Sequence, residues 1–445
     1  MANQILDRDT EKNMDQKERA LLVGVDLNHD EDFERSLEEL GALAEAAGME
    51  VAGKVTQALD SVNKAFYIGP GKVEETKNAA EMLHADIVLF DNSLSPSQLR
   101  NLQNELDMPV MDRSALILEI FADRATTREA RLQVEVARLQ YMLPRLVGLH
   151  EALSRQGGGS GSMSNKGAGE KKLELDRRRL EKRLTELRKE LQVVIEERKT
   201  QRKRRSQSGI PRVALVGYTN AGKSTLLNAM LDAYAPAETE LTTKRVMEKD
   251  MLFATLDTTV RKIEPENHHP LLLSDTVGFI DKLPHNLVEA FQSTLEEAKE
   301  ADVLLQVVDC SDPHYKEQIA VTNDTLKKLG AESIPQILVY NKADRSYDIS
   351  ELPIIREPGD GQMKIYMSAK NGVGLEELLT LIEKKLSGGF VSCEMLIPYT
   401  DGRALSYLNE HAVIQSTEYL PEGTKISVQC KSEDYAYYQK YVVNE

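Results

Sequence analysis

One eight-residue run in the sequence has the composition and spacing needed to bind a phosphate chain. The run is Gly217-Tyr218-Thr219-Asn220-Ala221-Gly222-Lys223-Ser224, which matches the pattern GxxxxGK[ST]. The apolar stretch 212–216 before it favours a strand, and the apolar spacing after it favours a helix. In this context backbone N–H groups wrap the phosphates, Lys223 reaches the β- and γ-phosphates, and the Ser224 hydroxyl binds Mg²⁺.

Three further motifs follow in order, each after a predicted strand. They are Asp275-Thr276-Val277-Gly278, Asn341-Lys342-Ala343-Asp344 and Ser368-Ala369-Lys370. We expect Asp275 to hold Mg²⁺ through water, and we expect the Gly278 N–H to meet the γ-phosphate. A carboxylate at Asp344 accepts hydrogen bonds from guanine N1–H and its amine, which adenine cannot supply. The third motif closes the base pocket with an N–H for guanine O6, so the predicted substrate is GTP.

A threonine-rich loop and one unusual phenylalanine complete the predicted site. The loop contains Phe253-Ala254-Thr255-Leu256-Asp257 and continues to Thr258 and Thr259. One threonine should supply a second Mg²⁺ hydroxyl when GTP orders the loop, and spacing leaves all three open. Phe279 stands where many small GTPases carry a water-positioning glutamine, so no catalytic residue is assigned. We expect slow hydrolysis of GTP by the free protein and stimulation by a partner.

The elements that must position these motifs are unevenly charged. A chain of 445 residues predicts about two to four domains. The net charge of −16 argues against a simple basic nucleic-acid binder. Residues 113–205, however, carry +10, whereas every other segment is acidic. We therefore predict four domains: 1–112, 113–205, 206–389 and 390–445. The third is expected to be a P-loop GTPase domain, with a mixed, mostly parallel sheet and helices on both of its faces.

The first and last segments read as small mixed domains. In 1–112, strand patterns at 20–25, 51–55 and 87–90 alternate with helix patterns, which indicates a parallel α/β sheet. The loop Gly69-Pro70-Gly71-Lys72 precedes a helix, and we favour a simple helix start over a phosphate site. Residues 390–445 suggest three strands around a helix at 403–411, an α+β tail.

The basic segment predicts a helical hairpin. Apolar residues recur every three or four positions in both of its halves, as suits helix-on-helix packing: Leu132, Val136, Leu139, Leu143 and Leu146, then Leu180, Leu184, Leu187, Leu191 and Val194. The glycine-rich stretch 157–169 between them predicts a non-helical tip. Residues 171–205 carry +8, which fits either a solvated face with internal ion pairs or a phosphate backbone as partner.

Other observations argue against a secreted protein, a membrane protein and a histidine metal site. Cys310, Cys393 and Cys430 lie far apart, which fits a reducing cytosol, and no apolar run reaches the length of a membrane span. His268 and His269 lack further ligand candidates, so we expect surface residues and no metal ligands.

At this point the sequence resembles a known family, the HflX GTPases. The resemblance lies in the runs 217–224, 253–257 and 275–279. It extends to Gly69-Pro70-Gly71-Lys72 and Leu153-Ser154-Arg155-Gln156-Gly157-Gly158-Gly159, and it covers about residues 20–390. It implies that Thr255 is the switch I Mg²⁺ ligand and that a hydrophobic residue is normal at position 279. The tip departs from the family's GTRGPGE-like stretch, with Lys166 as the nearest basic substitute.

The resemblance also implies a cellular role. A GTPase of this family binds the large ribosomal subunit and its rRNA in the GTP form and splits stalled or idle ribosomes under stress. Hydrolysis to GDP releases it. We therefore expect a cytoplasmic protein that is a monomer away from the ribosome. Two alternatives are an ATP-driven RNA-remodelling enzyme regulated by its G domain, and a signalling GTPase that works away from the ribosome.

Overall fold

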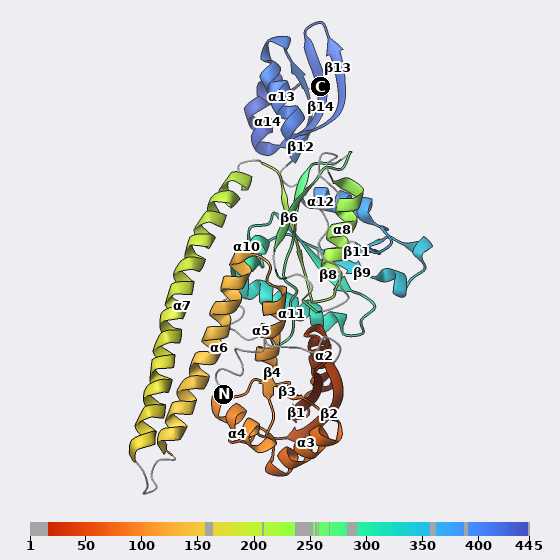
Figure 1. Cartoon of the computed structure of the whole chain (residues 1–445). Helices are drawn as coiled ribbons and strands as arrows, with labels where there is room; N and C mark the ends of the chain where they lie inside the picture. Colours follow the sequence, from red (N-terminus) through yellow and green to blue (C-terminus); the bar gives the residue numbers. More distant parts are fainter. Residues whose placement is uncertain are drawn as a thin grey trace. The chain divides into compact units, whose positions relative to one another are not determined.

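The computed structural model describes residues 17–155, 163–206, 209–235, 252–253, 256, 258–266, 268–282, 292–356, 362–386 and 390–443. The chain divides into two compact units, one made of 1–123 and 134–188, the other of 124–133 and 189–445. Figure 1 shows the elements of both units. Within the described ranges, no helix has the length and apolar character that crossing a membrane requires.

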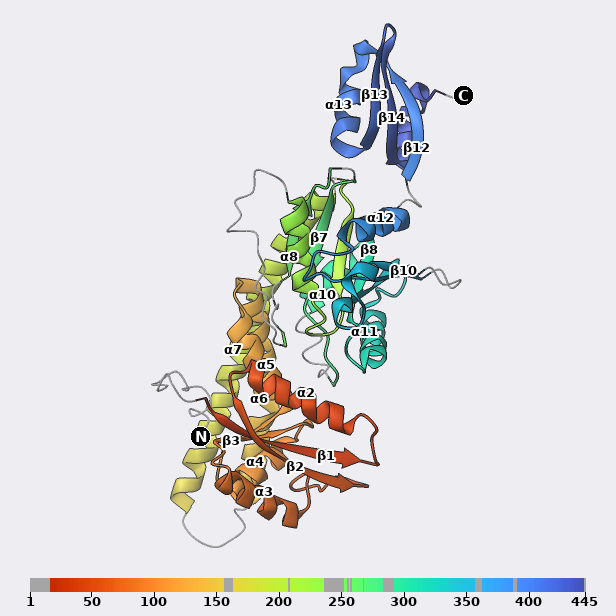
Figure 2. The same cartoon turned by 90° about the vertical axis from the view of Figure 1, so that its right-hand side faces the viewer.

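The N-terminal elements form a four-stranded parallel sheet in the order β2-β1-β3-β4. Leu21, Val23 and Val25 of β1 pack in one core with α3 and α4, whereas Gly24 faces Phe33 and Leu37 of α2. Side chains of a strand alternate between faces, so helices cover both sides of the sheet (Figure 2). In chain order the elements are β1 (Arg19–Leu27), α2 (Phe33–Ala46), β2 (Glu50–Leu59), α3 (Pro70–Met82), β3 (Ile87–Phe90), α4 (Pro96–Leu106), β4 (Val110–Asp112) and α5 (Arg113–Arg124).

The loop before α3 is a helix start. Gly69 is the N-cap and Pro70 occupies the first turn, while Lys72 forms an ion pair with Glu75 at 2.7 Å. Proline at the first helical position has no N–H to leave unpaired. The predicted helix start is therefore present, and the preference for it over a phosphate site stays a prediction.

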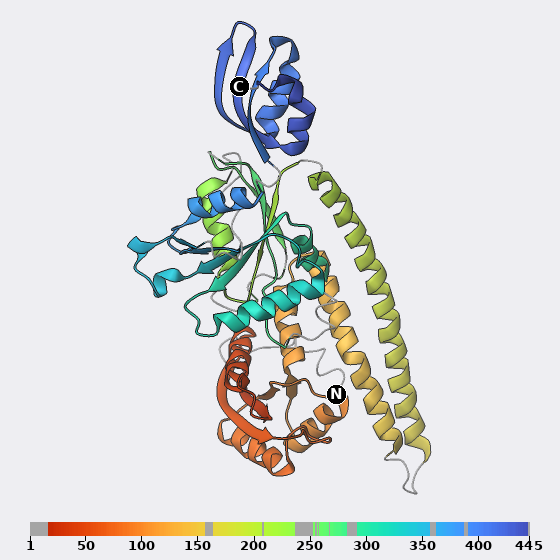
Figure 3. The ribbon, with the colours of Figure 1, turned by 180° about the vertical axis from the view of Figure 1, so that it is seen from behind.

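Two long helices, α6 (Arg128–Arg155) and α7 (Met163–Ser206), run side by side in opposite directions (Figures 1 and 3). Arg183 of α7 contacts Glu135 of α6 at 3.1 Å. Leu139 and Leu187 of the two predicted apolar stripes are buried. The predicted hairpin is thus present.

One prediction about the hairpin tip is wrong. Residues 163–169 belong to α7, although Gly167 and Gly169 were expected to exclude a helix. A glycine costs a helix only about 1 kcal/mol relative to alanine, and the strong helix formers that follow propagate α7 through this stretch. The rest of the predicted tip, 157–162, lies outside the described residues.

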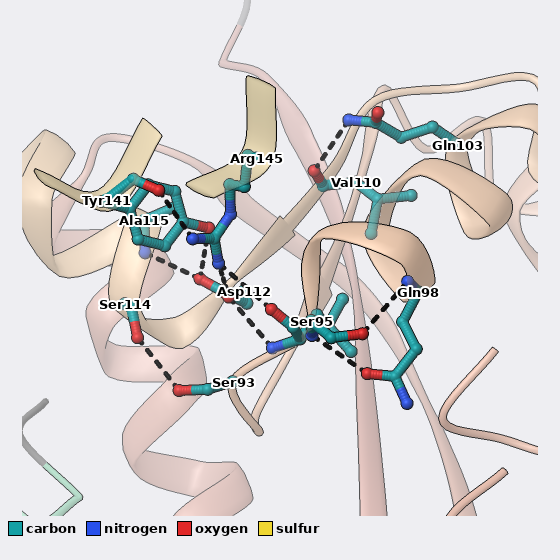
Figure 4. Close-up of polar contacts among 11 residues, drawn as sticks. Ser93, Ser95, Gln98, Gln103, Val110, Asp112, Ser114, Ala115, Tyr141 and Arg145 are labelled. Carbon is teal, nitrogen blue, oxygen red and sulfur yellow. Dashed lines mark hydrogen bonds and ion pairs between the residues drawn. The ribbon is translucent and has the colours of Figure 1, made fainter. Parts of the chain in front are cut away.

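The buried carboxylate of Asp112 fastens α6 to the N-terminal sheet (Figure 4). Asp112 Oδ1 accepts hydrogen bonds from the Ala115 N–H at 2.9 Å and the Tyr141 hydroxyl at 2.8 Å. Oδ2 accepts from the Leu94 N–H at 3.1 Å and from Arg145 Nη2 at 3.0 Å. Burial, then the Asp112 charge, raise the pKa of Tyr141, so its hydroxyl stays a donor. The outer part of α6 and the N-terminal sheet therefore form one body.

The central domain is a seven-stranded sheet in the order β10-β11-β9-β8-β5-β7-β6, parallel except at its two outer strands. Val213 and Leu215 of β5 pack with α8 and α12, while Ala214 and Val216 pack with α10 and α11. The predicted mixed sheet with helices on both faces is confirmed. Its elements are β5 (Arg212–Val216), α8 (Lys223–Tyr234), β6 (Thr259–Ile263), β7 (Leu271–Asp275), α10 (Gln292–Lys299), β8 (Val303–Asp309), α11 (Tyr315–Leu329), β9 (Gln336–Asn341), η3 (Ala343–Arg345), η4 (Ile349–Glu351), β10 (Ile354–Arg356), β11 (Met363–Tyr366) and α12 (Leu375–Leu386).

The expectation that His268 and His269 are surface residues is wrong. Both are largely buried, and His268 lies between Glu376 and Glu383 of α12, with each ring nitrogen 2.9 Å from a carboxylate. The sequence hid this arrangement because α12 is more than 100 residues further along the chain.

The tail is a three-stranded antiparallel sheet, β12-β14-β13, with both helices on one face (Figure 3). Met395 and Ile426 of the sheet share a core with Leu408 and Tyr438 of the helices. The predicted α+β tail is therefore present, with one helix more than expected. Its elements are β12 (Phe390–Ile397), η6 (Tyr399–Asp401), α13 (Gly402–His411), β13 (Val413–Leu420), β14 (Gly423–Lys431), α14 (Ser432–Tyr438) and η7 (Gln439–Tyr441).

Candidate nucleotide site

The phosphate-binding motif forms the turn between β5 and α8, and β5 pairs with β7. Figure 2 shows α8 beside β7. Gly222 has φ +93°, and a Cβ at this position would lie 2.2 Å from Asn341 Nδ2. Only glycine fits such a backbone, so the loop can pass close beneath the base-binding motif. The strand, loop and helix thus occur where the sequence placed them.

Lys223 is buried at the start of α8. Its Nζ donates hydrogen bonds to the carbonyl oxygens of Gly217 at 3.0 Å and Tyr218 at 2.7 Å. Burial lowers the pKa of the Lys223 ammonium to about 8, although the Asp275 carboxylate acts to raise it. A buried cation held inside a loop of backbone N–H groups is arranged to receive an anion.

Ser224 and Asp275 bring two oxygen atoms that can bind a metal ion together beside the loop. The Ser224 hydroxyl donates to Asp275 Oδ2 at 2.7 Å, and Asp275 is fully buried. The Thr276 hydroxyl, next along the chain, donates to the Leu215 carbonyl at 2.7 Å and fixes β7 to β5. A hydroxyl and a carboxylate are ligands that Mg²⁺ accepts, so this donor set fits the predicted metal.

Gly278 closes the space beside Lys223. A Cβ at Gly278 would lie 2.9 Å from Thr219 Cα and 3.0 Å from Lys223 Nζ. The following residue, Phe279, is joined to the loop by backbone hydrogen bonds: Thr219 N–H donates to its carbonyl at 2.8 Å, and its own N–H donates to the Gly217 carbonyl at 3.1 Å. The Asp275–Gly278 motif and the phosphate loop therefore meet, as predicted from their positions at strand ends.

The base-binding motifs also converge on the loop. Asn341 Nδ2 donates to the Ala221 carbonyl at 3.0 Å, and Asn341 Oδ1 accepts from the Ala369 N–H at 3.0 Å. One side chain therefore joins three of the predicted motifs. Asp344 is half-buried in η3 directly beyond it, and Lys370 is exposed beside Ser368.

Sequence reasoning missed one member of this cluster, Asp309 at the end of β8. Its carboxylate lies 2.8 Å from Lys342 Nζ, which also donates to the Asn220 carbonyl at 2.8 Å. An acidic residue at the end of a parallel strand was the available signal, because such ends share one edge of the sheet.

The switch loop is only partly described. Phe253 and Leu256 are buried, while Ala254, Thr255 and Asp257 lie outside the described residues. The choice among Thr255, Thr258 and Thr259 as Mg²⁺ ligand therefore stays a prediction, like the roles given to the other site residues.

Three family models match the chain in succession. One described as GTP-binding GTPase N-terminal matches residues 34–122, and one described as GTP-binding GTPase Middle Region matches 124–205. A third, 50S ribosome-binding GTPase, matches 212–342. The GTPase HflX of Caldanaerobacter subterraneus subsp. tengcongensis is 45% identical over 417 residues, 94% of this chain and 92% of the relative. The chain belongs to the HflX GTPase family.

The chain is also similar to a second HflX relative over most of its length. The GTPase HflX of Escherichia coli is 38% identical over 417 residues, 94% of each chain. A solved structure of a GTP-binding protein from Sulfolobus solfataricus with GDP is 26% identical, with a TM-score of 0.44, and the match covers 84% of this chain and 99% of that one. Membership of the HflX family confirms the predicted family and the P-loop GTPase fold. The chain is a GTPase of a ribosome-binding family.

Proposed function

We propose that this HflX GTPase binds the large ribosomal subunit and its rRNA in the GTP form and splits stalled or idle ribosomes under stress. Hydrolysis to GDP then releases it. The protein works in the cytoplasm, where its partner is, and is a monomer between rounds of binding. The 50S ribosome-binding model over 212–342 supports the choice of partner.

The observation that carries the proposal is an ionic link between the hairpin and the G domain. Arg198 of α7 contacts Glu129 of α6 at 3.0 Å and Glu297 of α10 at 3.3 Å. Their side chains are only 16%, 11% and 9% exposed, respectively. Helix α10 is the first described helix after the Asp275–Gly278 motif. A change at the γ-phosphate can therefore move the base of the hairpin.

The basic face of α7 supports RNA as the surface bound. Its arginines and lysines form ion pairs within the helix, such as Arg178 with Glu174 at 2.9 Å and Lys182 with Glu186 at 3.8 Å. Both interpretations of this face thus have support: it is solvated and internally paired, yet residues 171–205 keep +8. Exposed pairs are worth about 0–1 kcal/mol each, so RNA phosphates can displace the glutamates.

The same proposal includes the nucleotide and its metal. Ser224, with Asp275 behind it, would hold Mg²⁺, and Thr255 would join them when GTP orders the switch loop. The bound ion would supply positive charge that neutralises the charge developing during hydrolysis. Asn341 and Asp344 recognise guanine, and 368–370 close the pocket around it.

Co-sedimentation with purified large subunits tests the proposal. The wild-type protein should pellet with subunits in the presence of a non-hydrolysable GTP analogue and remain in the supernatant with GDP. Binding should weaken with added salt, as binding to phosphates requires. The K223A variant serves as the control that cannot respond to nucleotide. Equal pelleting in both nucleotides would defeat the proposal, as would intact ribosomes, followed by light scattering, that do not dissociate with GTP.

A further inference from the structure

The Phe279 side chain is excluded from chemistry at the nucleotide. It is 2% exposed and packs in the core cluster with Ala214, Val216 and Ala298, on the face of the sheet covered by α10 and α11. Its backbone bonds to the phosphate loop hold it there. Any side-chain hydrogen bond to the attacking water in the free protein must therefore come from another group.

The Thr219 hydroxyl is an unused polar group within the phosphate loop. Thr219 is 6% exposed, and its Oγ1 has no hydrogen-bond partner among the residues that the structure describes. Its neighbours are committed elsewhere: Ser224 Oγ donates to Asp275, and the Tyr218 hydroxyl accepts from the Asp281 N–H at 2.8 Å. Buried hydroxyls are nearly always hydrogen-bonded in folded proteins. An unsatisfied one here indicates a partner that arrives with the ligand.

The position of Thr219 identifies that partner. Thr219 Cγ2 would lie 2.9 Å from a Cβ on Gly278, and Lys223 Nζ would lie 3.0 Å from the same point. Lysine and backbone N–H groups of this loop cradle the terminal phosphates in P-loop enzymes. The side-chain atom of Thr219 nearest this point is the Cγ2 methyl carbon, and Oγ1 is bonded to the same Cβ. The Thr219 side chain therefore borders the place of the γ-phosphate, on the side of the segment that normally supplies the glutamine.

We propose that Thr219 replaces this glutamine: its hydroxyl accepts a hydrogen bond from the attacking water and donates one to a γ-phosphate oxygen. The water oxygen forms a bond to the γ-phosphorus while the bond from phosphorus to the β–γ bridging oxygen breaks. The electron pair of the broken bond leaves on GDP, and the water proton ends on the released phosphate. Thr219 itself gains and loses nothing.

Intrinsic hydrolysis by the full chain, measured in single turnovers without ribosomes, tests this assignment. T219V keeps the shape of the side chain and removes the hydroxyl, so turnover should fall about 100-fold, as when one preorganised hydrogen-bonding group is removed. The dissociation constant of GDP should stay unchanged, because GDP has no γ-phosphate. T219S, which restores the hydroxyl, should recover most of the rate.

T322V is the matched control. Thr322 is equally buried, on α11, and its hydroxyl donates to the Gln318 carbonyl at 2.8 Å, away from the site. The T322V variant should hydrolyse GTP at the wild-type rate. A T219V protein with the wild-type rate would overturn the proposal. So would a loss of GDP affinity matching the loss of rate, or a T219S variant as slow as T219V, because both indicate that Thr219 only shapes the loop.

Discussion

At the scale of single residues, burial decides what the nucleotide-site side chains can do. Lys223 has the same side chain as a surface lysine, but burial lowers the pKa of its ammonium group to about 8. The Phe279 side chain packs in the hydrophobic core and takes no part in GTP hydrolysis. The lowered pKa of Lys223 and the core packing of Phe279 can each be tested on purified protein.

The buried ammonium of Lys223 predicts proton uptake on nucleotide binding. Burial is the main cause of its lowered pKa, and bound phosphates raise the pKa again because they stabilise the charged form. Above a pH of about 8, GDP must bind together with a proton, so affinity should fall by up to about tenfold per pH unit. Calorimetry in buffers of different ionisation enthalpy measures this uptake. The K223Q variant should show none, and wild-type binding without uptake at high pH would contradict the prediction.

Phe279 predicts a stability cost without a catalytic gain. F279A should lower the free energy of unfolding by about 3–5 kcal/mol, because it opens a cavity in the cluster around Val216. F279L, which keeps an apolar side chain of intermediate size, should cost less than F279A because it leaves a smaller cavity. Urea unfolding gives both values. F279Q should not accelerate intrinsic hydrolysis, and a faster F279Q enzyme would show that this side chain can reach the nucleotide.

His268 predicts a pH-dependent part of the stability. Burial lowers its pKa, but hydrogen bonds and charges of Glu383 and Glu376 outweigh this effect and raise the pKa above 6.5. The folded state then holds the proton more tightly than the unfolded chain, so the stabilisation is complete below pH 6.5 and disappears as pH rises through the raised pKa. The stability difference between wild type and H268Q, from urea unfolding, should therefore shrink from acidic to alkaline pH. A constant difference would refute this.

At the scale of elements, the hairpin has two differently attached ends. The outer part of α6 is fastened to the N-terminal sheet by Asp112, Tyr141 and Arg145. The base of the hairpin is fastened to α10 through Arg198 of α7. Each attachment lies within one of the two compact units, so the hairpin is the element that both units share.

Loss of Arg198 should uncouple the hairpin from the nucleotide. R198M leaves Glu129 and Glu297 without this partner in a mostly buried position, which should cost about 1–3 kcal/mol of stability. Ribosome stimulation of GTP hydrolysis should fall, while the rate without ribosomes stays at the wild-type level. R138M is a matched control, since Arg138 of α6 also joins two helices, through a more exposed pair with Glu119 of α5 at 3.0 Å. Equal stimulation of R198M and R138M would refute the coupling.

At the scale of the whole molecule, we propose that the charge distribution orients binding to RNA. The net charge of −16 repels RNA, whereas 113–205 at +10 is attracted to it. Opposite fields of this kind select which end of a protein approaches a polyanion and raise the rate of productive encounters.

Neutralising the basic face of α7 should weaken ribosome binding and reduce its salt dependence. The substitutions are to glutamine at Arg177, Arg178, Arg179, Lys182 and Arg183. The slope of log affinity against log salt should decrease by about one for each RNA phosphate that the variant no longer binds. Neutralising Lys316, Lys327 and Lys328 of α11 is the control and should leave the slope unchanged. An unchanged slope in the α7 variant would count against the proposed RNA-binding face.

Much of this molecule followed from the sequence by itself. The phosphate loop, its strand and its helix are encoded in neighbouring residues, as are the apolar stripes of the hairpin, because periodicity and glycine placement are local properties. The order of motifs at strand ends also predicted that they would meet. Where local rules competed, prediction failed: helix propagation into 163–169 overcame two glycines.

Only the tertiary structure decided which distant groups touch. It placed His268 between two glutamates of α12, Arg198 between α6 and α10, and Asp309 beside Lys342. It also buried the Phe279 ring and left the Thr219 hydroxyl unsatisfied at the phosphate loop. These facts depend on packing between segments separated by many tens of residues. No local pattern encodes them, because burial and pairing are properties of the assembled core.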